Sequence, residues 1–178
     1  MMGDGQMSIG NVVAKPTTNK VRYLAKDKVI CGFAGAAADG LTLMDLIDKQ
    51  LKEYPGQLMR ACVETAKLWR TERMLRNLNA LLILCDSDMT LELSGSGEVF
   101  ESDGHIMAVG SGGNFAYAAA TALIDRDDLS AKEIAEKSMT IAADMCVFTN
   151  HNFKMLSLPN NKKEAINTEI KEEIAPPA

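Results

Sequence analysis

Apolar residues recur at helical spacing in two consecutive stretches of the chain. In residues 37–54 they fall three and four positions apart, and Pro55-Gly56 ends the pattern. The same spacing returns over residues 57–77. This period places apolar side chains on one face of a helix, and a Pro-Gly pair is a stop signal. The pattern predicts two consecutive amphipathic helices.

Short extended segments flank this helix pair. They are recognised by their length, their β-branched residues or their alternation of apolar and polar positions. Gly95-Ser96-Gly97 supplies a turn between two of them. The predicted strands are residues 7–13, 20–24 and 28–33 before the helices, and residues 81–85, 90–94, 98–101 and the buried run 106–109 after them.

A second pair of helices is predicted at residues 115–124 and 130–145. The latter opens with Ser130 and, three residues on, Glu133, the spacing of a capping box. A last strand is expected at residues 152–157. We expect one domain over residues 1–158, followed at 159–178 by a disordered tail that is polar and ends in prolines.

The order of these elements indicates the fold class. Strands, two helices, strands, two helices and a strand follow one another, which is typical of an α+β protein and not of a parallel βαβ sheet. Two stacked sheets with a helix pair on each outer side would bury every apolar face. We therefore expect a four-layer αββα sandwich.

Composition excludes several classes of function. The chain has 178 residues and a net charge of -5, without the basic patch of a nucleic-acid-binding protein. Its apolar runs are shorter than the roughly 18 residues of a membrane helix, and no signal-peptide pattern is visible. We expect no nucleic acid and no membrane among its partners.

Cysteines and histidines give no metal or nucleophile pattern. The two histidines are far apart, and the cysteines are scattered among apolar neighbours, which indicates buried thiols. The cysteines are Cys31, Cys62, Cys85 and Cys146.

The glycine-rich stretch Gly110-Ser111-Gly112-Gly113 fits no conventional catalytic motif. Val109 stands where a nucleophile elbow requires glycine, and no Lys-Ser or Lys-Thr pair follows, so a Walker A loop is excluded. Before a helix, its amides could hold an anion. A tight turn between strand and helix is the commoner explanation of such a pattern.

Several stretches together resemble one family. They are GDGQMSIGN, KVRYL, DKVICGFAGAAADGLTL, LWRTERMLRNLNALL, VGSGG, LSAKEIAEKSM and DMCVFTNH. The chain resembles the HslV (ClpQ) family, the proteasome-related peptidases among the N-terminal-nucleophile hydrolases. The resemblance covers nearly everything except the tail. It implies the same four-layer αββα sandwich as the element order.

The resemblance implies a threonine-type endopeptidase. In the family, the hydroxyl of an N-terminal threonine is the nucleophile, and an amine takes its proton. An α-amino group, with a pKa of about 7.7 to 8, suits that task. Asp4 matches the family's catalytic aspartate, and Lys20 matches the lysine beside the threonine hydroxyl. Gly35 matches the glycine whose N–H faces the oxyanion, and Ser111 matches the serine near the terminal amine.

The family also binds a monovalent cation, usually assigned as sodium, through backbone carbonyls of a G-x-x-C-x-x-T stretch. Here this stretch corresponds to Ala143, Cys146 and Thr149. Alanine replaces glycine at its first position. Since carbonyl oxygens are the ligands, we expect the Na⁺ site to persist if alanine tolerates the backbone angles.

The main departure from the family is the nucleophile itself. No threonine precedes Asp4, and Thr17 and Thr18 are internal, so neither carries a free amine. We expect a strand that begins with threonine upstream of Met1, without which this chain is inactive. The alternative is a catalytically inactive, ring-forming paralogue.

The resemblance further implies partners. Family members form a homo-oligomer of two stacked hexameric rings, and a ring-shaped HslU-type AAA+ ATPase unfolds protein substrates and feeds them in. The nucleotide belongs to that partner, because this chain has no nucleotide motif. The location would be cytoplasmic in a bacterium and the mitochondrial matrix in a eukaryote. An anion-binding α+β domain built on residues 110–113 is the competing function.

Overall fold

The structure is a computed structural model that describes residues 1–72, 78–103 and 105–159. Its centre is an antiparallel sheet in which neighbouring strands pair in the order β4-β5-β6-β7-β8. The strands are β4 (Val21–Leu24), β5 (Val29–Gly35), β6 (Ala80–Cys85), β7 (Thr90–Leu93) and β8 (Val99–Glu101). All five lie within or beside segments predicted as strands.

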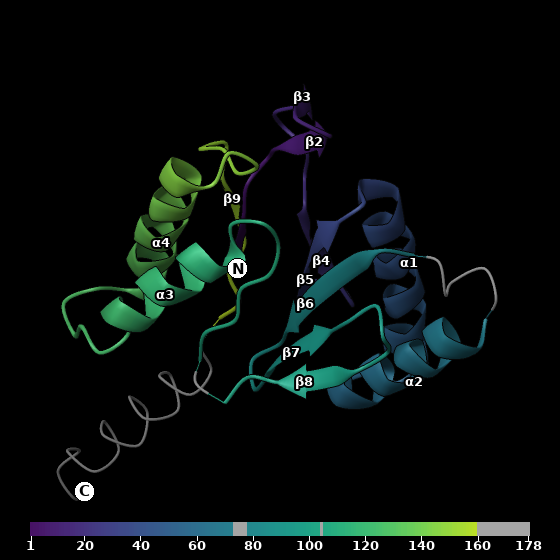
Figure 1. Ribbon diagram of the computed structural model, residues 1–178. Coiled ribbons are helices and arrows are strands. Elements are labelled where there is room, and N and C mark those ends of the chain that lie inside the picture. Colours follow the sequence, from purple (N-terminus) through teal and green to yellow (C-terminus); the bar gives the residue numbers. More distant parts are fainter. Residues whose placement is uncertain (73–77, 104, 160–178) are drawn as a thin grey trace, which may run out of the picture.

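One face of this sheet carries the hydrophobic core. The helices α1 (Ala37–Glu53) and α2 (Leu58–Thr71) cover it, as Figure 1 shows. Alternate strand residues point into this layer, among them Phe33, Leu82 and Leu91, and they pack in one buried cluster with the apolar faces of both helices. Both helices were predicted from their spacing, and the core confirms which face each one buries.

The second helix ends earlier than its pattern predicts. The prediction extended it over residues 57–77, but α2 ends at Thr71, and Glu72 is already extended, with φ -73° and ψ 120°. Residues 73–77 lie outside the described part. Apolar spacing is a poor guide to the last turn, because a backbone can leave the helix without an apolar position changing face.

The segment predicted as one strand at residues 7–13 is a hairpin. Strand β2 (Met7–Ile9) turns at Gly10, whose φ is +57°, and returns as β3 (Val12–Lys15). Glycine adopts this left-handed conformation without steric cost, and a following asparagine suits the same turn. The Gly10-Asn11 pair was therefore a turn signal inside an apolar run.

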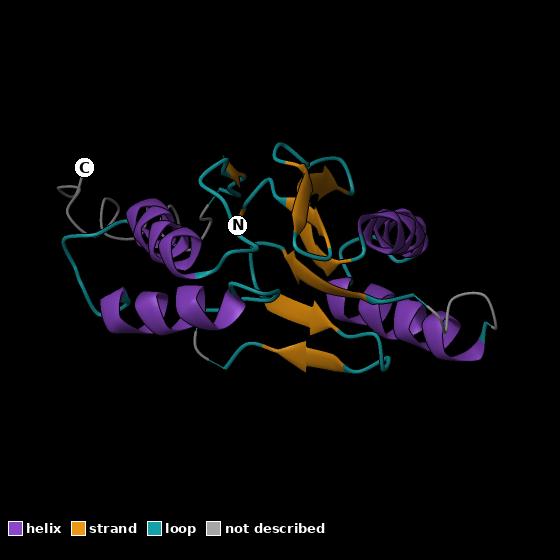
Figure 2. Ribbon diagram, turned by 45° about the horizontal axis from the view of Figure 1, so that its top comes forward, coloured by secondary structure: helices purple, strands orange, loops and turns teal. Residues whose placement is uncertain are grey.

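A second layer lies on the other side of the sheet. Strand β1 (Met2–Gly3) pairs antiparallel with β9 (Lys154–Met155), and the helices α3 (Gly113–Leu123) and α4 (Ala131–Met145) pack together outside them. Figure 2 shows the two helix groups on opposite sides of the strands. The α+β class and the order of layers are confirmed. The capping box at Ser130 and Glu133 is also confirmed.

The prediction of a strand at residues 106–109 is wrong. These residues are half-buried but pair with no strand in the described part of the chain. They line a cavity instead. Their apolar side chains are partly buried there, although no neighbouring strand pairs with their backbone. Within the described ranges, no helix has the length and apolar character to cross a bilayer.

Two leucines of α1 give a matched test of the core. Leu43 is fully buried and Leu41 is 38% exposed. We expect Leu43→Ala to lower the free energy of unfolding by about 2–5 kcal/mol, because it leaves a cavity. Leu41→Ala should change it by less than about 1 kcal/mol. Urea unfolding measures both, and equal effects would contradict this assignment of the core.

Candidate active site

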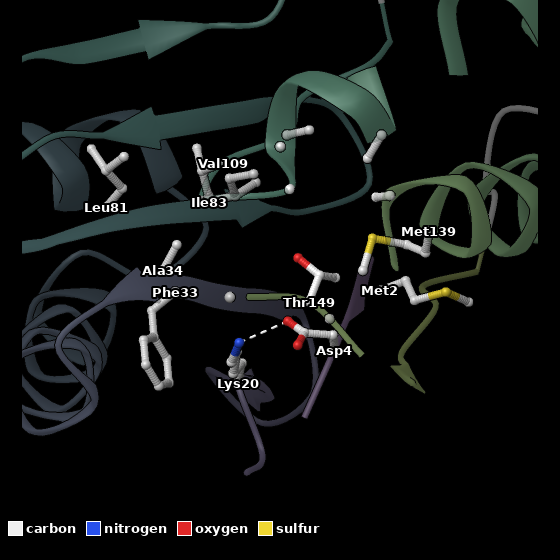
Figure 3. A pocket seen from close by; sticks show the side chains of 18 of the residues that line it. Met2, Asp4, Lys20, Phe33, Ala34, Leu81, Ile83, Val109, Met139 and Thr149 are labelled. Atoms are coloured by element: carbon white, nitrogen blue, oxygen red, sulfur yellow. Dashed lines mark hydrogen bonds and ion pairs between the residues drawn. The ribbon is translucent and has the colours of Figure 1, made fainter. Parts of the chain in front are cut away.

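Asp4 and Lys20 meet in a short ion pair. Lys20 Nζ donates to Asp4 Oδ1 at 2.7 Å, as Figure 3 shows. Asp4 immediately follows β1, and Lys20 immediately precedes β4, so the ends of two strands from different layers bring them together. The sequence-predicted aspartate and lysine are therefore neighbours.

The Asp4 carboxylate is held from several sides. Its Oδ2 atom accepts from the backbone N–H of Gln6 at 2.8 Å and from that of Asn150 at 3.3 Å. Only 8% of the Asp4 surface is exposed. Backbone donors to a carboxylate fix its orientation. The Asp4 carboxylate is thus held in a fixed orientation, and Lys20 is positioned by it.

Asn150 is a positioning residue that sequence reasoning missed. Its side-chain Oδ1 accepts from Gly5 N–H at 3.2 Å, and its Nδ2 donates to the Pro16 carbonyl at 2.9 Å. Asn150 therefore ties the turn that carries Asp4 to the loop that leads to Lys20. Its only signal in the sequence was its place in the stretch DMCVFTNH.

The pair borders a large cavity of about 980 Å³. One wall is the second face of the five-stranded sheet, with Ala34 on β5 and Ile83 on β6. The opposite wall comes from β1, α3 and α4, as the side chains of Met2 and Met139 show in Figure 3. An apolar cleft with a few converging polar groups is the usual form of a binding site.

Gly35 reaches this cavity at the end of β5. The Phe33 N–H donates to the Lys20 carbonyl at 3.1 Å. Because amides alternate along an antiparallel strand, the Gly35 N–H lies on the same edge of β5, beyond the start of β4 at Val21. A side chain is excluded at Gly35, where φ is +104° and a Cβ would lie 2.5 Å from the Asn79 carbonyl oxygen. Gly35 thus lines the cavity, with its N–H on the β4 edge of the strand.

A second glycine of β5 lies closer to the ion pair. Gly32 pairs with Val21, the residue after Lys20, and also lines the cavity. Its N–H, by the same alternation, lies on the β6 side of the strand. The amide N–H of Gly35 thus lies on the β4 edge of β5, and that of Gly32 lies on the β6 edge.

Ser111 enters the cavity from the side of α3. The Gly113 N–H donates to the Gly110 carbonyl at 3.0 Å, which closes the tight turn expected of this glycine-rich stretch. At Gly110, φ is +96° and a Cβ would lie 3.0 Å from the Ala34 Cβ, so the turn packs closely on β5. Ser111 therefore shares one cavity with Asp4, Lys20 and Gly35, although the ion pair itself does not include it.

The proposed cation ligands lie at the carboxyl end of α4. Ala143 is in the last turn, Cys146 follows the helix, and the Thr149 N–H donates to the Cys146 carbonyl at 3.0 Å. Ala143 has no positive φ, so alanine replaces the family's glycine without strain. Backbone carbonyls at this end of a helix carry partial negative charge, and their oxygens are ligands of the kind that hard cations prefer. The residues present fit a small cation; Thr149 also lines the cavity.

In residues 1–72, 78–103 and 105–159, no group of three His, Cys, Asp or Glu side chains is arranged to hold a metal ion. The prediction of buried thiols holds for Cys31, Cys62 and Cys146, while Cys85 is half-buried at the cavity. Burial raises the pKa of Cys62 to about 12. Such a thiol is not a nucleophile at neutral pH.

Comparisons with known proteins agree with this arrangement. A family model described as "Proteasome subunit" matches residues 1–158. The chain belongs to the proteasome family. It is also similar to a solved structure, the crystal structure of eukaryotic HslV from Trypanosoma brucei, with 47% sequence identity and a TM-score of 0.82. That match covers 86% of this chain and 88% of the trypanosome chain. The resemblance to HslV inferred from the sequence is confirmed, and membership of the family supports a protease core subunit.

The Asp4–Lys20 pair of this proteasome-family chain makes a testable contribution to stability. We expect Asp4→Asn to lower the free energy of unfolding by about 2–4 kcal/mol, because it leaves the Lys20 ammonium partly buried without its counter-charge. Asp45 provides the control, since its pair with Arg22 is exposed, with side-chain exposures of 71% and 37%. Asp45→Asn should cost less than about 1 kcal/mol. Equal losses in urea unfolding would show that Asp4 is not an anchored charge.

Proposed function

We propose that this chain is the proteolytic core subunit of an ATP-dependent protease, which cleaves peptide bonds of unfolded proteins with an N-terminal threonine as nucleophile. The observation that supports this most is the convergence of Lys20, paired to Asp4, with the Gly35 amide on one cavity. A cation and a backbone N–H beside an apolar cleft suit a reaction in which an alkoxide attacks a carbonyl and an oxyanion develops.

Each residue has a distinct role in the proposed reaction. The α-amine of the threonine takes the hydroxyl proton, and the Lys20 ammonium stabilises the alkoxide by its field. Asp4 holds Lys20 in place. The Gly35 N–H donates to the oxyanion of the tetrahedral intermediate, a contribution of about 2.7–4 kcal/mol for one donor. Ser111 orients the amine, which later returns its proton to the leaving nitrogen.

The nucleophile in this proposal comes from a segment upstream of Met1. Thr18 lines the cavity, and its Oγ1 is buried without a hydrogen-bond partner in the described residues. However, Thr18 is internal, so its nitrogen is a peptide amide and cannot act as the base. The N–H of this amide donates to the Gly5 carbonyl at 2.8 Å. Thr18 therefore does not replace an N-terminal threonine.

The proposed assembly is a homo-oligomer of two stacked hexameric rings that works with an HslU-type AAA+ ATPase. Family membership and the similarity to HslV support an oligomeric ring. The ATPase would bind the nucleotide and deliver unfolded protein. We place the complex in the cytoplasm of a bacterium or the mitochondrial matrix of a eukaryote.

Peptide hydrolysis tests the function. A form of the chain extended upstream to an N-terminal threonine, mixed with its ATPase, should hydrolyse peptides and an unfolded protein. Lys20→Met should lower kcat by at least about 10²-fold, because the alkoxide loses its counter-charge. Lys28→Met, at an exposed position, is the control. A folded, processed ring without hydrolysis would favour the inactive, ring-forming paralogue.

We also propose that backbone carbonyls of Ala143, Cys146 and Thr149 hold Na⁺. A cation bound only by the folded state raises its stability by mass action. The melting temperature should therefore be higher in NaCl than in N-methylglucamine chloride at the same ionic strength. Equal melting temperatures in the two salts would contradict the site whatever the activity of the enzyme.

A further inference from the structure

A carboxylate lies on the cavity face of the five-stranded sheet, at Glu92 on β7. Its neighbours Leu91 and Leu93 are buried in the core on the other face, and successive strand residues point to opposite faces. Glu92 is directly opposite Ile83 of β6, which lines the cavity, as Figure 3 shows. The carboxylate therefore lies beside the cavity wall, on the face that has space for the proposed reaction.

No cationic group of the described chain meets this carboxylate. Over residues 1–72, 78–103 and 105–159, Glu92 takes part in none of the ion pairs, and its side chain accepts no hydrogen bond. The side chain is half-buried, and this burial raises its pKa. Asp4, by comparison, has Lys20 and two backbone amides. A carboxylate that is partly out of water without such donors is a cost to the folded chain, and a cationic ligand would offset it.

An exposed aromatic ring lies next to this carboxylate. Phe100 on β8 is directly opposite Glu92, and the Cβ atoms of opposite residues in an antiparallel pair are about 4.5–5.5 Å apart. Val99 packs against the core, so Phe100 points to the same face as Glu92, where it is 49% exposed. In the described part of the chain β8 pairs with β7 alone, as the outer strand of the sheet (Figure 1). The far side of the ring is therefore open to a ligand.

Ile83, Glu92 and Phe100 thus form a row across three strands: an apolar side chain, a carboxylate and an aromatic ring. An arginine side chain has the complementary parts. Its stem is apolar, and its planar guanidinium pairs with carboxylates and stacks on aromatic rings. The chain contains a contact of the second kind elsewhere, since the guanidinium carbon of Arg60 lies 4.3 Å from the centre of the Tyr54 ring.

We propose that Glu92 and Phe100 form a binding site for an arginine side chain of the polypeptide substrate. The guanidinium pairs with the carboxylate and lies over the ring, while the aliphatic stem covers Ile83. Lysine binds more weakly there, because its ammonium group cannot make a bidentate pair and does not stack. This inference rests on the proposed function, since it takes the polypeptide in the cavity as the source of the arginine.

The register of the sheet sets the distance from this site to the proposed reacting centre. Paired residues form one row across four strands: Val21, Gly32, Ile83 and Glu92. Val21 directly follows Lys20. Three strand spacings of about 4.8 Å place Glu92 roughly 14 Å from Val21, and an extended polypeptide advances about 3.3 Å per residue. An arginine about four residues from the cleaved bond therefore reaches the site.

Peptide binding to the 178-residue chain tests the site without hydrolysis. A fluorescent apolar peptide with one arginine should bind about tenfold more tightly than the same peptide with citrulline, which has a similar shape without the charge. Glu92→Gln should abolish this difference, and Phe100→Leu should reduce it. Glu101→Gln is the matched control, since Glu101 is exposed on β8 and lies opposite Leu91, on the other face. Equal affinities for the two peptides, or a difference that survives Glu92→Gln, would overturn the proposal.

Hydrolysis separates this inference from the proposed function. In the form extended to an N-terminal threonine, KM should be lowest for peptides with the arginine about four residues from the cleaved bond. The kcat should change little, because the site lies away from the reacting atoms and binds substrate and transition state alike. An equal KM for every position of the arginine refutes the site and leaves the protease standing. Arginine-selective binding without hydrolysis of any peptide refutes the proposed function and leaves the site.

Discussion

The ion pair between Asp4 and Lys20 is the interaction on which the rest of the site depends. It joins the end of β1 in one layer to the start of β4 in the other, with 2.7 Å between Lys20 Nζ and Asp4 Oδ1 beside the cavity. A partly buried pair is stable only when its remaining polar atoms are bonded. The amides of Gln6 and Asn150 meet that condition at Asp4. The Lys20 ammonium, held by Asp4 on one side, thereby borders the cavity that Gly35 also lines.

The two faces of the five-stranded sheet are used differently. One face is sealed by α1 and α2 around Phe33 and Leu82. The other, with Ala34 and Ile83, borders the cavity, and β1 with β9 is the small second layer across it. A sheet that was packed tightly on both faces would leave no room for a polypeptide beside Lys20. The unequal filling of the two faces therefore leaves the space for the proposed reaction at the second face.

Much of this could be predicted from sequence because local patterns decide it. Apolar spacing located the helices, and Ser130 with Glu133 marked the start of α4 because both groups of a capping box lie within one turn. The pairing of Asp4 with Lys20 was not a local pattern; it came from resemblance to a family. Errors arose where tertiary contacts decide: residues 106–109 look like a strand but have no partner strand. Asn150 was missed because a positioning amide has no spacing that identifies it.

The turn after α4 connects the proposed cation site to the Asp4–Lys20 pair. The Val147 carbonyl accepts from the Gln6 side chain at 2.9 Å, and the Asn150 N–H donates to Asp4. The same turn carries the Cys146 and Thr149 carbonyls. A cation bound there would restrain the backbone that orients the Asp4 carboxylate, only a few residues away. Its contribution to the reaction would then be indirect: it would hold Asp4, which holds Lys20, without contacting the substrate. This explains how backbone carbonyls outside the reacting centre can matter to the activity proposed for it.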